Sequence, residues 1–268
     1  MSFARPLWVI TLLSSASASM LSAFEIIAHR GGADEAPENT IAAAKLALAN
    51  GADAIEGDVH LTKDGRLVVI HDLNTQRTTG VEGKIEEMTL AELKTLDAGR
   101  SKGQKFSGEK IPTPDELLAL IPDGKRLIME IKQNAETIAG LKSALEQSGK
   151  KSAQLQIICA KHAILERVKK ELPECSTLWL PVYRDKKTGN VSNLENVLKQ
   201  AVAAGINGLL LKDWPVDAAF TAKVHAAGLK LYISTVNDAA FAREFKKIGI
   251  DGVTSDRPGW LRQELARQ

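Results

Sequence analysis

The sequence lacks the charge imbalance that is typical of proteins with a broad polyanion-binding face. Its 35 Lys and Arg residues nearly balance 33 Asp and Glu residues, for a formal net charge of +2. The lysine-rich stretches at 166–174 and 183–190 also lack the regular interleaving of aromatic residues on which single-stranded bases stack. These features exclude nucleic acid as an expected partner, and any anion recognition should be local.

Long apolar runs are also missing. The apolar run at residues 7–13 is far shorter than the roughly 20 residues of a spanning helix, so we expect no stable membrane insertion. It follows an early arginine and precedes small residues with candidate cleavage sites near 18 and 23. The pattern predicts a signal peptide at residues 1–23, and hence a periplasmic or secreted protein whose residues 24–268 form one domain.

Cysteine is scarce, with Cys159 and Cys175 alone in the chain. Cys159 falls toward the end of a predicted strand at 155–160, and Cys175 falls just before the next one at 177–182. In parallel neighbouring strands these positions lie at opposite poles, about 15 Å or more apart. A disulfide requires Cα atoms within about 7 Å. Two free or buried thiols are therefore expected rather than a disulfide.

What the sequence does contain is a loose repeat of an Ala-rich helix, a glycine and an apolar strand, as around Gly51, Gly205 and Gly249. Strands without polar alternation indicate burial on both faces and hence a parallel sheet. Strands are predicted at 25–29, 54–59, 126–132, 155–160, 177–182, 207–211, 229–235 and 252–255. Helices are predicted at 41–49, 114–120, 134–148, 162–171, 193–204, 216–226, 238–247 and 259–266.

Eight such strand–helix units in this length predict an α/β fold, a (β/α)₈ TIM barrel. An open doubly wound sheet is the alternative, although no G-x-G-x-x-G follows the first strand. The rhythm breaks after strand two, where an insertion at about 73–112 is expected. In a barrel such insertions lie at the C-terminal face, where active sites are built.

Carboxylates gather at neighbouring strand ends. Glu56 and Asp58 lie two apart on one side of strand two, and Glu130 and Lys132 are likewise two apart at the end of strand three. Buried carboxylates repel one another unless a cation neutralises them. Because thiolates are absent and imidazoles few, the pattern predicts one divalent cation of the oxygen-binding kind, Mg²⁺ or Ca²⁺, on Glu56, Asp58 and Glu130.

A second histidine is expected beside this cluster. Asp64-Gly65 between alternating runs is a hairpin signal, and a two-residue turn there would pair Asp58 with His71. Directly opposed residues project to one side of a hairpin, so His71 would lie next to the carboxylates. The prediction depends on register, since a shift of one residue would turn His71 away. His60, farther along the arm, is expected to be exposed.

The first strand delivers His29 and Arg30 to the same face. Two imidazoles can serve as base and acid near neutral pH, while a metal with Arg30 and Lys132 can hold a phosphate. This set suits phosphodiester cleavage, with His29 and His71 as the catalytic pair. Other polar residues are expected to cap helices or border the cleft: Glu38, Asn39, Asp213, Asn237 and Asp256.

With these residues in view, the sequence resembles the glycerophosphodiester phosphodiesterase family from about Glu25 to the C-terminus. The matching segments are AHRGGADEAPENT, EGDVHLTKDGRLVVIHD, LDAG, KIPTPDELL, MEIK, STVND and GVTSDRP. The resemblance implies a barrel with a small insertion after strand two and a metal on the positions of Glu56, Asp58 and Glu130. It also implies His29 and His71 as the acid–base pair, with Arg30 and Lys132 on the phosphate.

The reaction implied by the resemblance is hydrolysis of a small-molecule glycerophosphodiester to glycerol 3-phosphate and an alcohol. A lysophospholipid or sphingolipid phosphodiesterase on the same scaffold is one alternative, and a non-catalytic exported binding protein is another. The chain departs from the family at Ser234, where an aromatic residue usually precedes TVN. An aromatic wall is therefore missing, or is supplied by Trp214, Tyr183 or Phe106.

Overall fold

The computed structural model describes residues 23–132, 134–183, 191–212 and 214–267. Apart from Ala23, the predicted signal peptide at residues 1–23 lies outside the described residues, as does Asp213. No helix within the described ranges combines the length and apolarity that crossing a bilayer would require.

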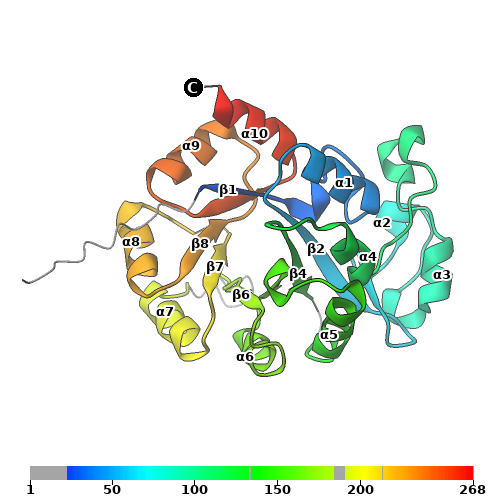
Figure 1. Cartoon of the computed structure of the whole chain (residues 1–268), viewed down its shortest axis with the longest axis horizontal. Coiled ribbons are helices and arrows are strands. Elements are labelled where there is room, and N and C mark those ends of the chain that lie inside the picture. The colour runs from blue at the N-terminus through cyan, green and yellow to red at the C-terminus, as the bar shows by residue number, and fades with distance from the viewer. Residues whose placement is uncertain (1–22, 133, 184–190, 213, 268) are drawn as a thin grey trace, which may run out of the picture.

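A single sheet forms the centre of the molecule (Figure 1). Its strands are β1 (Glu25–Ala28), β2 (Ala54–Leu61), β3 (Leu67–Val69), β4 (Arg126–Ile131), β5 (Leu155–Cys159), β6 (Ser176–Trp179), β7 (Gly208–Leu211), β8 (Lys230–Ile233) and β9 (Gly252–Ser255). Neighbours follow the order β1-β9-β8-β7-β6-β5-β4-β2-β3, and β1 also pairs with β2. The pairs are parallel except β2–β3. The β1–β2 pairing closes an eight-stranded barrel, which confirms the predicted TIM barrel and rules out the open sheet.

Helices surround the barrel in Figure 1. The outer ring consists of α1 (Ile41–Ala49), α4 (Pro114–Leu120), α5 (Thr137–Ser148), α6 (His162–Glu171), α7 (Leu194–Ala203), α8 (Ala218–Ala226), α9 (Ala239–Lys247) and α10 (Pro258–Ala266). Several begin at a side chain that accepts a backbone N–H, as Thr40, Asn193, Asp217 and Asp238 do. Local capping thus helps to set where the βα loops end.

The strands bury both of their faces. Side chains between sheet and helices form the larger core, which includes Ile26, Ala28 and Ile55. The other face fills the barrel, with Ile27, Ala54, Ile128, Ile158, Leu178, Leu210 and Tyr232 in one buried cluster. Because successive residues of a strand point to opposite faces, this interior cluster determines which later residues face the barrel mouth.

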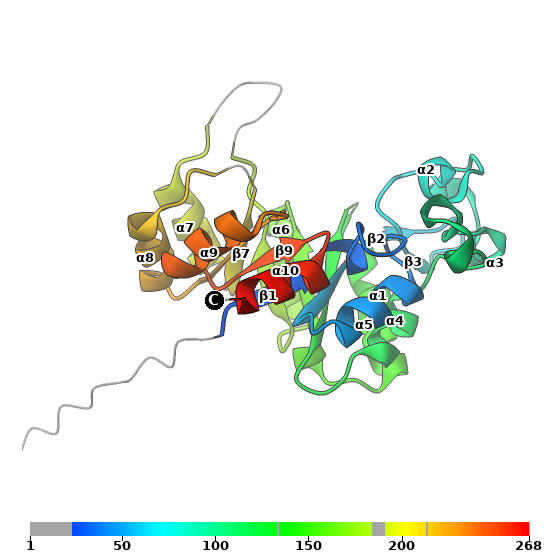
Figure 2. The same cartoon turned by 90° about the horizontal axis from the view of Figure 1, so that it is seen from above.

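The segment between β3 and α4 stands beside the barrel on the α1 and α4 side (Figure 2). It contains α2 (Gln76–Thr79), α3 (Leu90–Thr95) and short 3₁₀ turns at Ile85–Glu87, Arg100–Lys102 and Gln104–Phe106. It shares a small core with β3, made of Val68, Ile70, Ile85, Leu93, Ala98 and Ile111. The segment is therefore a well-packed part of the domain, and it can hold polar side chains in fixed positions at the mouth of the barrel.

The two cysteines are unpaired and buried, as predicted. Cys159 ends β5 and Cys175 immediately precedes β6, and in the ladder Cys159 pairs with Trp179 rather than with the start of that strand. The parallel register therefore keeps the thiols at opposite ends of neighbouring strands.

Candidate active site

The polar side chains of the site continue the barrel-facing rows of the strands. Two residues beyond Ile27 lies His29, and two beyond Ile128 lies Glu130. Along β2, Ala54 is followed at the same parity by Glu56 and Asp58. A cavity of about 150 Å³ at the C-terminal ends of the strands is lined by His29, Arg30, Glu56, His71, Glu130, Lys132, Leu180, Leu210, Lys212, Ser234, Thr235 and Thr254. The strand period thus brings together residues that are distant in sequence.

The chain turns sharply after β1. Arg30 (φ 51°), Gly31 (φ 81°) and Gly32 (φ 95°) all have left-handed backbone conformations, which glycine adopts without strain. A Cβ at Gly31 would approach the Cβ of Ala43 to 2.8 Å, so side chains there are excluded by space as well. The turn directs the Arg30 backbone N–H to Glu56 Oε2 at 2.8 Å. The two glycines therefore allow the loop to fold back onto the acidic cluster.

Glu56, Asp58 and Glu130 form one acidic cluster, with a ligand oxygen from each within 4.8 Å of the others. Glu56 and Asp58 are buried. Burial, together with the charge of Asp58, raises the pKa of Glu56 to about 8. Lys132 Nζ lies 3.0 Å from Asp58 Oδ1 and 2.9 Å from Glu130 Oε2. Lys132 thus pairs with two of the three carboxylates, Asp58 and Glu130.

The donor set of this cluster fits a hard divalent cation, because every available ligand atom is a carboxylate oxygen. Asn39 helps to hold this cluster, because its Nδ2 donates to Asp58 Oδ2 at 3.0 Å. Its buried Oδ1 has no hydrogen-bond partner among the described residues. The cluster is therefore a candidate metal site by its composition.

His71 reaches the cavity by a different route from the one predicted. The hairpin pairs Val59 with Val69 and Leu61 with Leu67, and the Thr62 N–H donates to the Arg66 carbonyl at 2.9 Å. Its loop therefore has three residues, 63–65, and the predicted two-residue turn is wrong. Gly65 takes the left-handed conformation (φ 71°) that a three-residue loop with a bulge requires. Asp58 then pairs with Ile70, whose N–H donates to the Asp58 carbonyl at 2.9 Å. His71 lines the cavity because the chain bends after the strand ends.

His60 is buried, and the expectation that it would be exposed is wrong. Its Nε2 donates to the backbone carbonyl of His71 at 3.1 Å. Burial lowers the pKa of His60. A neutral imidazole below the site therefore helps to hold the bend that presents His71.

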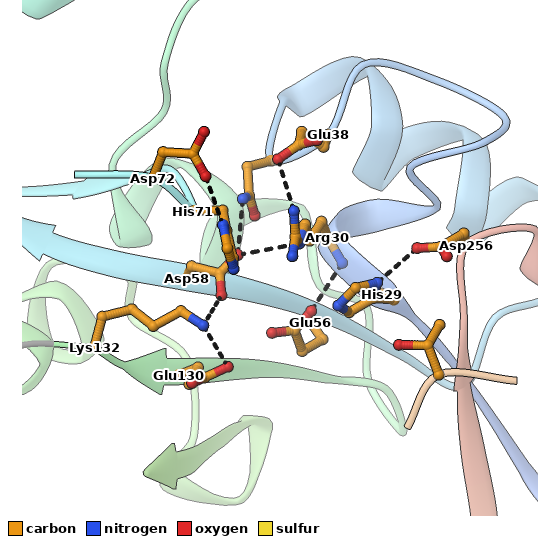
Figure 3. A network of polar contacts seen from close by, with 12 residues as sticks. His29, Arg30, Glu38, Glu56, Asp58, His71, Asp72, Glu130, Lys132 and Asp256 are labelled. Atoms are coloured by element: carbon orange, nitrogen blue, oxygen red, sulfur yellow. Dashed lines mark hydrogen bonds and ion pairs between the residues drawn. The ribbon is translucent and has the colours of Figure 1, made fainter. Parts of the chain in front are cut away.

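Each cavity-lining histidine is paired with a carboxylate through Nδ1 (Figure 3). His29 Nδ1 donates to Asp256 Oδ1 at 2.6 Å, and His71 Nδ1 donates to Asp72 Oδ1 at 2.7 Å. Burial alone would lower the pKa of His29, but the bond to Asp256 and the charges of Glu56 and Asp256 outweigh it and raise that pKa. Both rings are fixed as tautomers with Nε2 available for proton transfer.

Arg30 is held by carboxylates on both sides (Figure 3). Its Nη1 donates to Glu38 Oε1 at 3.1 Å, and its Nε lies 3.7 Å from Asp58 Oδ2. Glu38 also accepts hydrogen bonds from both terminal nitrogens of Arg77, at 2.6 and 2.7 Å. Asp72 accepts a hydrogen bond from Arg77 Nε at 2.6 Å. A residue of the insertion therefore braces the partners of both Arg30 and His71.

A second, larger cavity of about 460 Å³ opens to solvent on the side of the insertion. It is lined by His29, Arg30, Ala33, Asp34, Glu38, Arg77, Ser101, Lys102 and Asp256. The two cavities share His29 and Arg30. These two residues therefore stand where the halves of a two-part ligand would meet.

Neither cavity has an aromatic wall among the described residues that line it. Ser234 faces the smaller cavity directly. Tyr183 and Trp214 pack on each other, with ring centroids 5.0 Å apart, and Phe106 lies under Lys105. None of the three candidate rings therefore lines either cavity as the structure describes it.

Three residues that hold other side chains of the site in place were not predicted from the sequence: Asp256, Asp72 and Arg77. Asp256 was expected only to border the cleft, but it bonds His29 and is itself held by Asn237 Nδ2 at 2.6 Å. Asp72 follows His71 directly in the chain, which was an available signal. No signal in the sequence pointed to Arg77, because its position depends on how the insertion packs.

The fold is a (β/α)₈ barrel, and its mouth carries two histidine–aspartate pairs beside an acidic cluster. The glycerophosphoryl diester phosphodiesterase family matches residues 29–260. The chain therefore belongs to this family of phosphodiesterases, which confirms the resemblance.

Individual relatives support this family assignment. A glycerophosphodiester phosphodiesterase of Caldanaerobacter subterraneus subsp. tengcongensis is 38% identical over 240 residues, covering 88% of this chain and 95% of the relative. One from Bacillus subtilis is 31% identical, with 94% and 90% covered. A solved phosphodiesterase of Oleispira antarctica, in complex with the product sn-glycerol-3-phosphate, has a TM-score of 0.79 at 32% identity, with 90% and 96% covered.

Proposed function

We propose that this enzyme hydrolyses glycerophosphodiesters to glycerol 3-phosphate and an alcohol, with one divalent cation on Glu56, Asp58 and Glu130. The observation that carries the proposal is the presence of two carboxylate-oriented histidines and a three-carboxylate cluster in one cavity. The named activity of the relatives and the bound product of the Oleispira antarctica structure support the substrate class.

The acidic cluster would hold the cation, Mg²⁺ or Ca²⁺, because its ligand atoms are all carboxylate oxygens. Such an ion, when bound, withdraws charge from phosphate oxygens and neutralises the cluster. Arg30 and Lys132 line the same cavity and would bind the phosphate. Both are positioned in advance, Arg30 by Glu38 and Lys132 by Asp58 and Glu130.

His29 and His71 would carry the proton transfers. One ring accepts a proton at Nε2 from the attacking hydroxyl, and the other donates one to the leaving oxygen as the phosphorus–oxygen bond breaks. Asp256 and Asp72 keep the rings in the required tautomer through Nδ1. The nucleophile is water, or the neighbouring glycerol hydroxyl through a cyclic phosphate that water opens later. Phosphorus NMR during turnover separates these routes, because only the second accumulates a cyclic species.

The lining of the larger cavity favours a polar alcohol over an acyl chain. Of its nine lining residues, Ala33 alone is aliphatic. A lysophospholipid or sphingolipid phosphodiesterase would need an apolar wall there. A non-catalytic binding protein would not need two histidines with oriented rings. Both alternatives are therefore weaker than glycerophosphodiester hydrolysis.

The test is hydrolysis of glycerophosphocholine by wild type, His29→Ala and His71→Ala, with and without a chelator. His225→Ala is the matched control, because His225 bonds Asp251 at 2.9 Å just before β9, away from the strands' C-terminal ends. We expect losses of about 10²-fold or more in both site variants, loss with chelator, and no change in the control. Chelator-insensitive turnover would contradict the metal assignment, and unchanged rates in both site variants would contradict the acid–base assignment.

We further propose that the protein acts in the periplasm or as a secreted enzyme, on the basis of the signal-like pattern at residues 1–23. Fractionation of expressing bacterial cells, followed by N-terminal sequencing, tests this. Export with cleavage near 18 or 23 is expected, whereas an intact N-terminus in the cytoplasm would contradict it.

A further inference from the structure

We propose that the 460 Å³ cavity beside the insertion binds the leaving alcohol, and that it favours an alcohol carrying both a carboxylate and an ammonium group, as serine does. This inference rests on the proposed function, since it assigns the second half of the same substrate. It names Asp34 and Lys102 as specificity-determining residues.

The two cavities differ in a way that matches the two ends of a glycerophosphodiester. The smaller cavity, about 150 Å³, is walled mainly by barrel strand ends and presents the hydroxyls of Ser234, Thr235 and Thr254. These groups and a small fixed volume suit the glycerol moiety, which is common to every substrate of this class. The larger cavity is open and partly built by the insertion. It suits the alcohol, which varies from one substrate to another.

Most of the charge on the larger cavity's wall is already engaged. The engaged side chains pair with one another or with Asp72 and Asp58, and they are His29, Arg30, Glu38, Arg77 and Asp256. Asp34 and Lys102 differ, because neither side chain has a hydrogen-bonding or ionic partner among the described residues. One carboxylate and one ammonium thus remain available to a ligand.

These two free charges are complementary to the two charges of a zwitterion. Lys102 can pair with a ligand carboxylate and Asp34 with a ligand ammonium. Choline offers only a quaternary ammonium, which proteins recognise chiefly with aromatic rings. The described residues that line this cavity include no such ring. The wall is therefore better matched to serine than to choline.

The experiment compares kcat/KM for four substrates: glycerophosphoserine, glycerophosphoethanolamine, glycerophosphocholine and glycerophosphoglycerol. Glycerophosphoglycerol is the internal reference, because its alcohol carries no charge. The variants are Lys102→Gln and Asp34→Asn, neither of which belongs to the proposed acid–base or metal groups. Lys105→Gln is the matched control, because the Lys105 ammonium lies 4.7 Å above the Phe106 ring and is not part of the cavity wall.

We expect wild type to prefer the serine substrate to the choline one. Lys102→Gln should lower kcat/KM for glycerophosphoserine by about threefold, the scale of one exposed charge pair, and leave glycerophosphoethanolamine unchanged. Asp34→Asn should lower both by a similar factor. Neither variant should alter glycerophosphoglycerol turnover, and Lys105→Gln should behave as wild type with all four.

Substrate ratios that stay at wild-type values in both Lys102→Gln and Asp34→Asn would overturn the subsite. So would equal losses on all four substrates, because these would indicate a general effect on the site. Failure of wild type to hydrolyse any of the four would instead overturn the proposed function. The two failures are therefore distinguishable.

Discussion

Arg77 of the insertion donates two hydrogen bonds to Glu38, a residue 39 positions earlier in the chain, at 2.6 and 2.7 Å. Its third donor reaches Asp72, the partner of His71. Glu38 in turn holds Arg30. The insertion is thereby connected, through one planar guanidinium, to both the predicted phosphate-binding and the predicted proton-transfer side of the site.

Arg77→Lys should lower kcat/KM by roughly tenfold, because an ammonium cannot reproduce the fork that binds Glu38 and Asp72 together. The variant keeps the charge, so the loss reports orientation. The measurement is steady-state kinetics with the melting temperature as a folding check. Arg66→Lys, at the hairpin tip far from these contacts, is the control. A fully active Arg77→Lys enzyme would contradict the bracing role.

Asp256→Asn should lower the pKa of His29. Burial depresses that pKa, and the Asp256 bond and charge are among the influences that raise it. Removing the carboxylate charge leaves burial less opposed, so the limb of the pH–rate profile governed by His29 should move to lower pH. We also expect kcat to fall by about 10²-fold. A profile with unmoved limbs would show that Asp256 does not tune the ring.

Cation binding should release protons at neutral pH. Without a cation, burial and Asp58 raise the pKa of Glu56 to about 8, so at pH 7 Glu56 is mostly protonated. A metal ligand must be deprotonated, and calorimetry at pH 7 in buffers of different ionisation enthalpy should therefore detect release approaching one proton per ion. Release should fade above about pH 9, and Glu56→Gln should abolish it.

Binding of Mg²⁺ or Ca²⁺ should also stabilise the fold. An ion at 100 times its dissociation constant adds about 2.7 kcal/mol to the free energy of unfolding if it binds only the folded chain. Thermal unfolding with and without each ion measures this and compares the two cations. Asp58→Asn should lose the increase. An unchanged melting temperature with both ions at millimolar concentration would argue against the site.

Asp53 should stabilise the barrel in a pH-dependent way. Burial alone would raise its pKa, but the Ile26 N–H, Lys125 and Arg262 hold that pKa below its usual value. Its contribution is therefore fully present above the unfolded pKa, about 3.9, and is lost as pH falls through the folded value.

Asp53→Asn should cost about 1 kcal/mol of unfolding free energy at pH 7, with the difference shrinking toward pH 3. Urea denaturation at the two pH values measures it. Glu87→Gln, which removes an exposed pair with Lys84, is the control and should change stability little. A deficit that is the same at both pH values would show that the carboxylate charge is not the cause.

The secondary structure and much of the site follow from local patterns. Apolar runs that follow a helix and its terminal glycine predict the strands, and a period of two places Glu56 with Asp58 and Glu130 with Lys132 on shared faces. The hairpin register does not follow, because a loop of two residues and a loop of three fit the same Asp64-Gly65 signal. The predicted pairing of Asp58 with His71 failed for this reason.

Local periodicity thus indicates which residues point into the barrel, because strand geometry is a property of a few consecutive residues. Partners across the site depend on closure of the sheet, which brings Asp256, just after β9, to His29, just after β1. They also depend on the packing of the insertion, which carries Arg77 to Glu38 and leaves Lys102 on the wall of the larger cavity. Such contacts join segments with no sequence relationship to one another, so only the folded chain decides them.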